Sequence, residues 1–123
     1  MSAVLLMGTI SSAHAAPSSE CEGASQIEIG NCVAKTEATV NKTIEMALGF
    51  AMNSAADLDQ VTGRKVAVPA LIAGQSAWEA YRDQHCAFVG ATFGGGSGTG
   101  IAILDCRIEL GRDRFDTLMD YVG

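Results

Sequence analysis

Four cysteines constrain this chain more than any other feature. They stand at positions 21, 32, 86 and 106 of a 123-residue sequence, a length that allows one domain with a thin hydrophobic core. In an oxidising compartment four cysteines form two disulfides, for which three pairings exist. We favour sequential pairing, Cys21 with Cys32 and Cys86 with Cys106, because it closes two short loops. Each bridge would contribute about 3 kcal/mol to the free energy of unfolding.

The alternative for these cysteines is a zinc site with four thiolate ligands. Structural zinc sites take ligands from closely spaced pairs such as C-x-x-C, and the sequence contains no such pair. We therefore expect neither a metal nor a cofactor.

The first 15 residues have the pattern of a secretory signal peptide. An uncharged apolar run at residues 3–10 precedes Ala13-His14-Ala15, an A-x-A cleavage pattern, although no Lys or Arg stands before the run. The run is shorter than the roughly 20 residues that span a bilayer, and Pro17 disfavours the alternative of a buried helix. We assign residues 1–15 to a signal peptide and residues 16–123 to one helical domain that is periplasmic or secreted from a bacterium.

The charge balance narrows the class of partner. Eight Lys and Arg against fourteen Asp and Glu give a formal net charge of −6. Nucleic acids and anionic membranes repel such a surface, so we expect no nucleic-acid partner and no stable membrane anchor. A basic protein would be attracted to this negatively charged surface.

Apolar residues recur with helical spacing after Ser25 and Glu28, which form a capping box. The pattern predicts a first helix of about 25 to 30 residues that ends near Asn53-Ser54, followed by a polar connection over residues 55–65. The predicted apolar stripe of this helix consists of Ile29, Val33, Val40, Ile44, Leu48 and Ala51.

Two further helices follow. Pro69 suits the first turn of the second helix, and residues 101–121 form the third. The predicted apolar face of the second helix contains Leu71, Gly74, Trp78, Tyr81, His85 and Phe88. Gly74 would allow a neighbouring helix to approach closely. The predicted apolar face of the third helix contains Leu104, Ile108, Gly111, Phe115, Leu118 and Val122. Because a glycine inside a helix costs about 1 kcal/mol relative to alanine, we expect a bend or a close contact at Gly111. Arg112 and Asp116 are spaced to pair on the outside.

The predicted fold is therefore all-α: a small three-helix bundle, or a helical hairpin plus a third helix, stapled by disulfides. No run of alternating β-branched residues is long enough for a sheet.

Residues 90–100 form a glycine-rich loop between the second and third helices. Its backbone N–H groups could form a nest for an anion, although no P-loop lysine follows. Alternatively the loop projects into a partner's cleft, with Ser97 and Thr99 offering hydroxyl groups. A plain flexible connection between the second and third helices is an equally good interpretation of this loop.

The block Trp78, Tyr81, Arg82, Asp83 could be a recognition surface, because Trp, Tyr and Arg dominate binding hot spots. We favour a structural role, since two of these residues lie on the predicted apolar face.

His85 has no neighbouring nucleophile or second metal ligand in the sequence. The chain is therefore not predicted to be an enzyme.

With these landmarks in place, the sequence resembles the lysozyme inhibitor LprI-like family of small exported bacterial domains. The residues that carry the resemblance are Cys21, Ser25, Gln26, Glu28, Cys32, the block Gln75-Ser76-Ala77-Trp78-x-x-Tyr81-Arg82-Asp83-x-x-Cys86, Gly95-Gly96-Ser97, Cys106, Leu110, Arg114 and Leu118. The chain departs from the family pattern at Val40-Asn41, Ile44-Glu45, Leu48 and Gly111.

The resemblance implies an exported binding protein that inhibits lysozyme by occluding its cleft, with a basic lysozyme as partner. The alternative is a structural or adaptor module of the cell envelope without lysozyme activity. We assign partner binding to Gly95, Gly96, Ser97, Thr99 and Arg82, and a structural role to Gln75, Trp78, Tyr81, Asp83 and Arg114.

Overall fold

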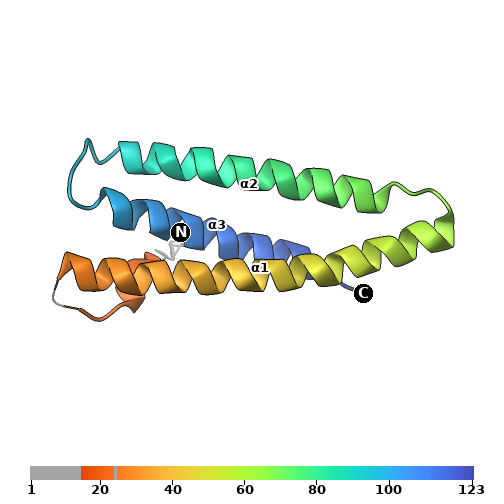
Figure 1. The fold of residues 1–123 in the computed structure, drawn as a ribbon, viewed down its shortest axis with the longest axis horizontal. Coiled ribbons are helices and arrows are strands. Elements are labelled where there is room, and N and C mark those ends of the chain that lie inside the picture. The colour runs from red at the N-terminus through yellow and green to blue at the C-terminus, as the bar shows by residue number, and fades with distance from the viewer. Residues whose placement is uncertain (1–14, 24) are drawn as a thin grey trace, which may run out of the picture.

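The computed structural model describes residues 15–23 and 25–123, and over that range it is entirely helical (Figure 1). Its elements are a short 3₁₀ helix η1 (Pro17–Glu20) and the α-helices α1 (Gln26–Thr62), α2 (Ala67–Ala91) and α3 (Thr99–Met119). The two longest helices run antiparallel, and α3 packs against both. The predicted all-α fold is confirmed. The predicted signal peptide falls on residues that lie outside the described range, except for Ala15.

Helix α1 begins as predicted and ends later than predicted. The Ser25 hydroxyl accepts a hydrogen bond from the Glu28 backbone N–H at 3.1 Å and caps the first turn. The predicted end near Asn53-Ser54 and the predicted connection over residues 55–65 are wrong, because the helix continues to Thr62. No helix breaker stands between these positions, and the first residue that stops the helix is Gly63, which adopts the left-handed conformation at φ +67°.

Asp59 joins the end of α1 to the start of α2. Its carboxylate accepts hydrogen bonds from the backbone N–H groups of Val66 at 3.1 Å, Ala67 at 2.8 Å and Val68 at 3.0 Å. These bonds, those from Val68 and Ala67 above all, lower the pKa of Asp59. A side chain one turn before the end of α1 therefore caps the next helix, and this fixes the tight turn between them.

The hydrophobic core lies along the shared faces of α1 and α3. The predicted α1 stripe is confirmed, since each of its members is buried or packs against the core. The buried apolar residues of this core are Val33, Val40, Ile44, Ala47, Ala51, Ile108 and Leu118. Most are small or medium-sized, so the core is thin, as the chain length predicts.

Gly111 lies where α3 crosses α1. A Cβ atom built on this glycine would stand 2.6 Å from Cγ1 of Val40, which is closer than carbon atoms approach. The predicted close contact at Gly111 is therefore confirmed. Only a residue without a side chain allows α3 to lie this close to α1.

The predicted apolar face of α2 is wrong for three of its members. Tyr81 is 54% exposed and Phe88 64% exposed, and a Cβ atom on Gly74 would meet nothing within 4 Å. The face that α2 buries instead carries Gln75, Arg82, Cys86 and Gly90. Because two of these residues are polar, hydrophobic spacing assigned the wrong orientation to the helix.

Both disulfides follow the predicted sequential pairing. Cys21–Cys32 ties the segment before α1 to its second turn, and Cys86–Cys106 joins α2 to α3. All four sulfur atoms are thus bonded in pairs, which excludes the alternative of a thiolate zinc site.

The N-terminal segment is held against α3 by polar contacts. Asp105 accepts hydrogen bonds from the backbone N–H and the hydroxyl of Ser18, both at 2.7 Å. Arg112 donates two hydrogen bonds to the Glu20 carboxylate, at 3.0 and 3.3 Å. The predicted pair between Arg112 and Asp116 is therefore wrong, because Arg112 reaches the 3₁₀ helix instead.

The two helical glycines give a matched test of the packing. Gly111→Ala is expected to lower the free energy of unfolding by about 1–3 kcal/mol, because the new methyl group has no space. Gly74→Ala is expected to raise it by about 1 kcal/mol, because the added methyl group meets open space and alanine favours the helix. Urea unfolding followed by circular dichroism measures both changes, and equal effects at the two positions would contradict the described packing.

Candidate functional site

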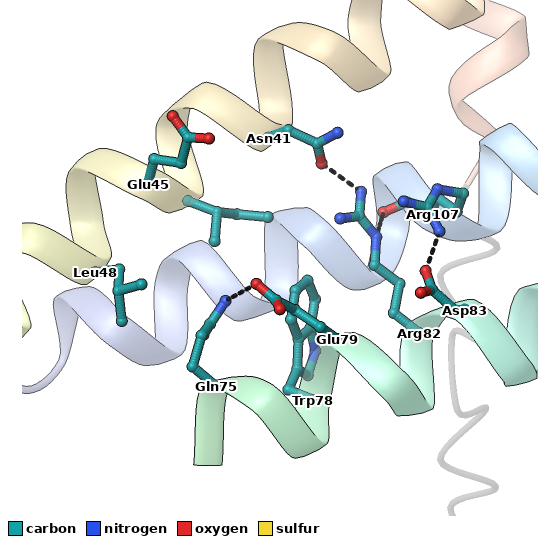
Figure 2. A pocket seen from close by; sticks show the side chains of 10 residues that line it. Asn41, Glu45, Leu48, Gln75, Trp78, Glu79, Arg82, Asp83 and Arg107 are labelled. Carbon is teal, nitrogen blue, oxygen red and sulfur yellow. Dashed lines mark hydrogen bonds and ion pairs between the residues drawn. The ribbon is translucent and has the colours of Figure 1, made fainter. Parts of the chain in front are cut away.

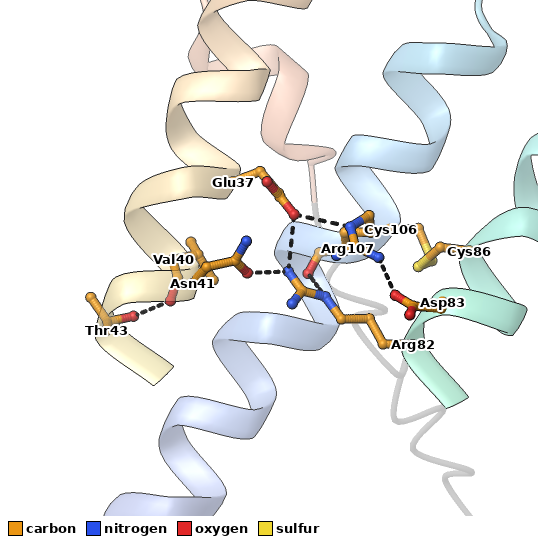
Figure 3. A network of polar contacts seen from close by, with 9 residues as sticks. All are labelled: Glu37, Val40, Asn41, Thr43, Arg82, Asp83, Cys86, Cys106 and Arg107. Atoms are coloured by element: carbon orange, nitrogen blue, oxygen red, sulfur yellow. Dashed lines mark hydrogen bonds and ion pairs between the residues drawn. A yellow bond between two sulfur atoms is a disulfide. The ribbon is translucent and has the colours of Figure 1, made fainter. Parts of the chain in front are cut away.

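Gln75, Trp78 and Arg82, which belong to the block Gln75–Cys86 of the sequence (the Gln-x-x-Trp block), lie at a junction of all three α-helices. At its centre Arg82 of α2, which is only 5% exposed, donates from Nη2 to the Asn41 side-chain oxygen of α1 at 2.7 Å. Its Nε donates to the backbone carbonyl of Arg107 in α3 at 3.1 Å. One guanidinium group therefore bonds to both other helices (Figure 3).

Carboxylates of α1 and α2 lie near the guanidinium group of Arg82. Glu37 lies 3.6 Å from Arg82 Nη2 and accepts a hydrogen bond from Arg107 Nε at 2.9 Å, and Arg107 also bonds to Asp83 (Figure 3). Burial alone would raise the pKa of Glu37, but hydrogen bonds from Arg107 and Asn41 and the nearby arginine charges leave it below the usual value. Glu37 is therefore held as a carboxylate.

Trp78 lies close to two guanidinium groups. Arg82 stands 5.2 Å and Arg114 5.8 Å from the centre of its ring, within the range of cation–π contact. Arg114 donates from Nε to Gln75 at 2.9 Å, and Gln75 in turn donates to Glu79 at 3.3 Å. Gln75, Trp78, Arg82 and Arg114 thus form one connected set.

Asp83 joins this set through Arg107, and Tyr81 does not. The Tyr81 ring points outward and stacks on His85 with ring centroids 5.3 Å apart, and Phe88 follows at 6.3 Å from His85. The structure therefore brings together four of the five residues predicted to share a structural role, with Asp83 linked at the edge, and places Tyr81 apart from them. Asn41, Glu37 and Arg107 complete the junction, and nothing in the sequence beyond their charge or polarity indicated that they belong to it.

A groove of about 300 Å³ opens beside the junction, between α1 and α2 (Figure 2). Glu45 and Glu79 stand on opposite sides of it, and the side chains of Trp78 and Arg82 reach its wall (Figure 2). Its full lining is Asn41, Ile44, Glu45, Leu48, Gln75, Trp78, Glu79, Arg82, Asp83 and Arg107. The cations in this groove already bond to neighbouring groups, so the groove offers no free positive charge to an anion.

The glycine-rich loop lies at the end of the bundle where α2 turns into α3 (Figure 1). Gly94 and Gly95 adopt positive φ angles of 61° and 82°, which side chains rarely tolerate. Gly96 donates from its N–H to the Phe93 carbonyl at 3.0 Å, and the Thr99 hydroxyl donates to the Gly96 carbonyl at 2.7 Å. The loop is therefore a series of tight turns with a defined shape.

The residues assigned to partner binding fall in two places. Gly95, Gly96 and Ser97 are exposed on the loop, and Thr99 starts α3 with its hydroxyl bonded to the loop backbone. Arg82 lies in the buried junction, away from the loop, where its guanidinium group is already bonded to α1 and α3. A partner could reach Arg82 only through the adjoining groove.

A scan against protein-family models matches residues 18–118 to the model described as Lysozyme inhibitor LprI. The matched range contains all four cysteines, the helix junction and the glycine-rich loop. The chain belongs to the LprI family. No curated protein and no solved structure matches it.

Membership in the LprI family fits the chemistry of the described residues. The family is one of inhibitors rather than enzymes, and its name implies a protein partner. Over residues 15–23 and 25–123 no three His, Cys, Asp or Glu side chains gather as a metal site would require. In the same range no helix has the length and apolarity needed to cross a membrane. The two disulfides fit a protein that folds in an oxidising compartment.

Replacing Arg82 tests the junction. Arg82→Met should lower the free energy of unfolding by about 3 kcal/mol, because the carboxylate of Glu37 and the amide of Asn41 lose a buried partner. Arg112→Met removes a partly exposed arginine that pairs with Glu20 and should cost less than about 1 kcal/mol. Denaturant unfolding of both variants makes the comparison, and equal costs would show that the junction does not stabilise the bundle.

The lowered pKa of Glu37 predicts a pH dependence. A carboxyl whose folded pKa lies below its unfolded value contributes stability above the unfolded value of about 4.5, and this stability disappears as the pH falls through the folded pKa. The wild-type protein should therefore be more stable than Glu37→Gln at pH 7, and the difference should shrink steadily below pH 4.5. Thermal unfolding at a series of pH values measures this, and a difference that does not change with pH would contradict it.

Proposed function

We propose that this protein is exported to the periplasm or beyond and inhibits lysozyme by placing its glycine-rich loop in the lysozyme cleft. The observation that carries the proposal is the match of residues 18–118 to the LprI family of lysozyme inhibitors. The disulfides support the export step, because such bonds persist outside the reducing cytosol. The shape and charge of the loop support the mode of binding.

The loop suits a narrow cleft because it has little side-chain bulk. Three consecutive glycines, Gly94 to Gly96, form its outer part, and the internal hydrogen bonds of Gly96 and Thr99 hold the turns in place. A loop that is ordered before binding loses little conformational entropy on contact. Ser97 adds one exposed hydroxyl group, and Phe93 beside it is 49% exposed, which gives the loop an apolar anchor.

The charges of the chain favour this orientation. The net charge of −6 draws the protein towards a basic enzyme over a distance of about one Debye length. Residues 86–104 contain no Asp, Glu, Lys or Arg at all. Lysozyme-type glycosidases carry two carboxyl groups in the cleft, and an uncharged loop meets them without repulsion. The acidic surface thus accelerates the encounter, and the neutral loop enters the cleft.

A pair of serine substitutions tests this mode of binding. Ser97→Glu places a carboxylate on the loop, and Ser76→Glu makes the same change at an exposed position on α2. Ser97→Glu should weaken inhibition of lysozyme at least about tenfold, because the carboxyl groups of the cleft repel it, and Ser76→Glu should leave it near the wild-type value, since both change the net charge equally. Lysis of bacterial cell walls by lysozyme, followed by turbidity over a range of inhibitor concentrations, gives the inhibition constants.

The circular dichroism spectrum of each variant controls for folding. Equal inhibition by the two variants would show that the loop does not enter the cleft. Absence of inhibition by the wild-type protein at micromolar concentration would remove the proposed function and leave the adaptor of the cell envelope, which a pull-down from envelope extract would then test.

A further inference from the structure

The opposite end of the bundle has an unfilled apolar groove. Helix α3 ends at Met119, while α1 and α2 continue beyond it and meet at the turn of residues 63–66 (Figure 1). We call residues 51–72 the hairpin tip. A groove of about 390 Å³ lies along it, where a longer α3 would pack, and its lining is Ala51, Ser54, Ala55, Leu58, Ala67, Ala70, Leu71, Leu118 and Tyr121.

Large apolar side chains at this end of the bundle face solvent. Leu58 and Tyr121 line the groove and are 55% and 73% exposed, and Val61, Val66 and Ile72 of the same hairpin tip are 86%, 49% and 55% exposed. Exposed apolar residues that occur singly need no explanation, but a group of them beside an apolar groove marks an interaction surface. The small residues in the groove leave room for the side chains of a partner.

The charges of the tip indicate which partner it suits. The tip contains two acidic and two basic residues, Asp57, Asp59, Arg64 and Lys65, so its net charge is zero, whereas the whole chain has a net charge of −6. A basic protein would gain no attraction at such a surface. Two copies of this chain repel each other through most of their surface, and contact at the neutral tips keeps their acidic regions apart.

The ends of the groove carry opposite charges. Arg64 and Lys65 lie in the exposed turn at the outer end. The inner end lies at the C-terminus of α3, where Gly123 donates from its N–H to the Ser54 hydroxyl at 3.2 Å and Asp120 is exposed. The carbonyl end of a helix adds partial negative charge there. In an antiparallel pair of tips, the basic turn of each copy faces the acidic end of the other.

We propose that the hairpin tip is a self-association surface, through which two copies pack antiparallel, with the turn at Arg64 and Lys65 of each against Asp120 of the other. The four helices of the two tips then enclose a shared apolar core that contains Leu58 and Val61. Residues 51–62 of α1 span about 18 Å. This short overlap predicts a reversible dimer rather than a permanent one, because stable interfaces bury about 800 Å² on each partner.

Sedimentation equilibrium over a range from micromolar to about 1 mM protein tests the proposal. The wild-type chain, with its disulfides formed and without its first 15 residues, should show a monomer–dimer equilibrium. Leu58→Asp should raise the dimer dissociation constant at least about 30-fold, as expected for a central apolar contact. Ile27→Asp is the matched control, because Ile27 is also exposed on α1 but lies at the opposite end, and it should leave the constant unchanged.

A charge exchange tests the antiparallel arrangement without touching the apolar residues. Lys65→Glu alone should weaken the dimer, and adding Asp120→Lys to the same chain should restore much of the loss. A wild-type chain that stays monomeric throughout the range would overturn the proposal, as would a dimer that Leu58→Asp does not weaken. The proposal does not depend on the proposed function, because the dimer is measured without lysozyme.

Discussion

One buried cation links the three α-helices. Arg82 belongs to α2, and its hydrogen bonds end on Asn41 of α1 and on the Arg107 carbonyl of α3. Among the residues that the structure describes, the largest fully buried side chains are Ile108, Leu118, Val33 and Cys86, so apolar burial alone holds α2 weakly. A guanidinium group in the interior is stabilising only when its partners are in place. The Cys86–Cys106 disulfide, one turn from Arg82 on α2, keeps them in place by fixing α2 against α3.

This junction leaves both ends of the bundle free for other tasks. On one side of it the disulfide and the close packing of α2 on α3 support the glycine-rich loop, whose turns are held by its own backbone. On the other side α1 and α2 continue without α3 and are joined by the Asp59 cap. Residues 86–104 carry no charged side chain, and the hairpin tip carries two acidic and two basic residues, Asp57, Asp59, Arg64 and Lys65. These two regions therefore contribute nothing to the net charge of −6, which comes from the rest of the domain.

The sequence predicted the features that rest on simple spacing. The apolar stripe of α1, the sequential disulfides and the close contact at Gly111 could be predicted because apolar residues at helical spacing, paired cysteines and a glycine inside a helix each usually have one structural role. The orientation of α2 could not be predicted in this way, because Gln75 and Arg82 point inward and their burial depends on partners from distant parts of the chain. The length of α1 was predicted too short for a related reason. The sequence indicates that Asp59 is a polar surface residue of a connection, and only the folded turn brings three backbone N–H groups to its carboxylate.

The candidate site was predictable only in part. The Gln-x-x-Trp block identified the α2 residues of the junction, and nothing in the sequence connected them to Glu37, Asn41 or Arg107, which lie tens of residues away. Arg82 was assigned to partner binding from the sequence, and its buried position makes it a link between helices instead. The exposed part of the proposed site is consequently the loop, and the proposed inhibition of lysozyme depends on that loop.

The most direct test is a nuclear magnetic resonance titration of the isotope-labelled domain with unlabelled lysozyme. Amide signals of residues 93–99 should shift or broaden first and most strongly, while those of the junction and of the hairpin tip change little. Shifts confined to α1 or to the tip, or a spectrum unchanged at equimolar lysozyme, would contradict the claim that the glycine-rich loop is what the enzyme binds.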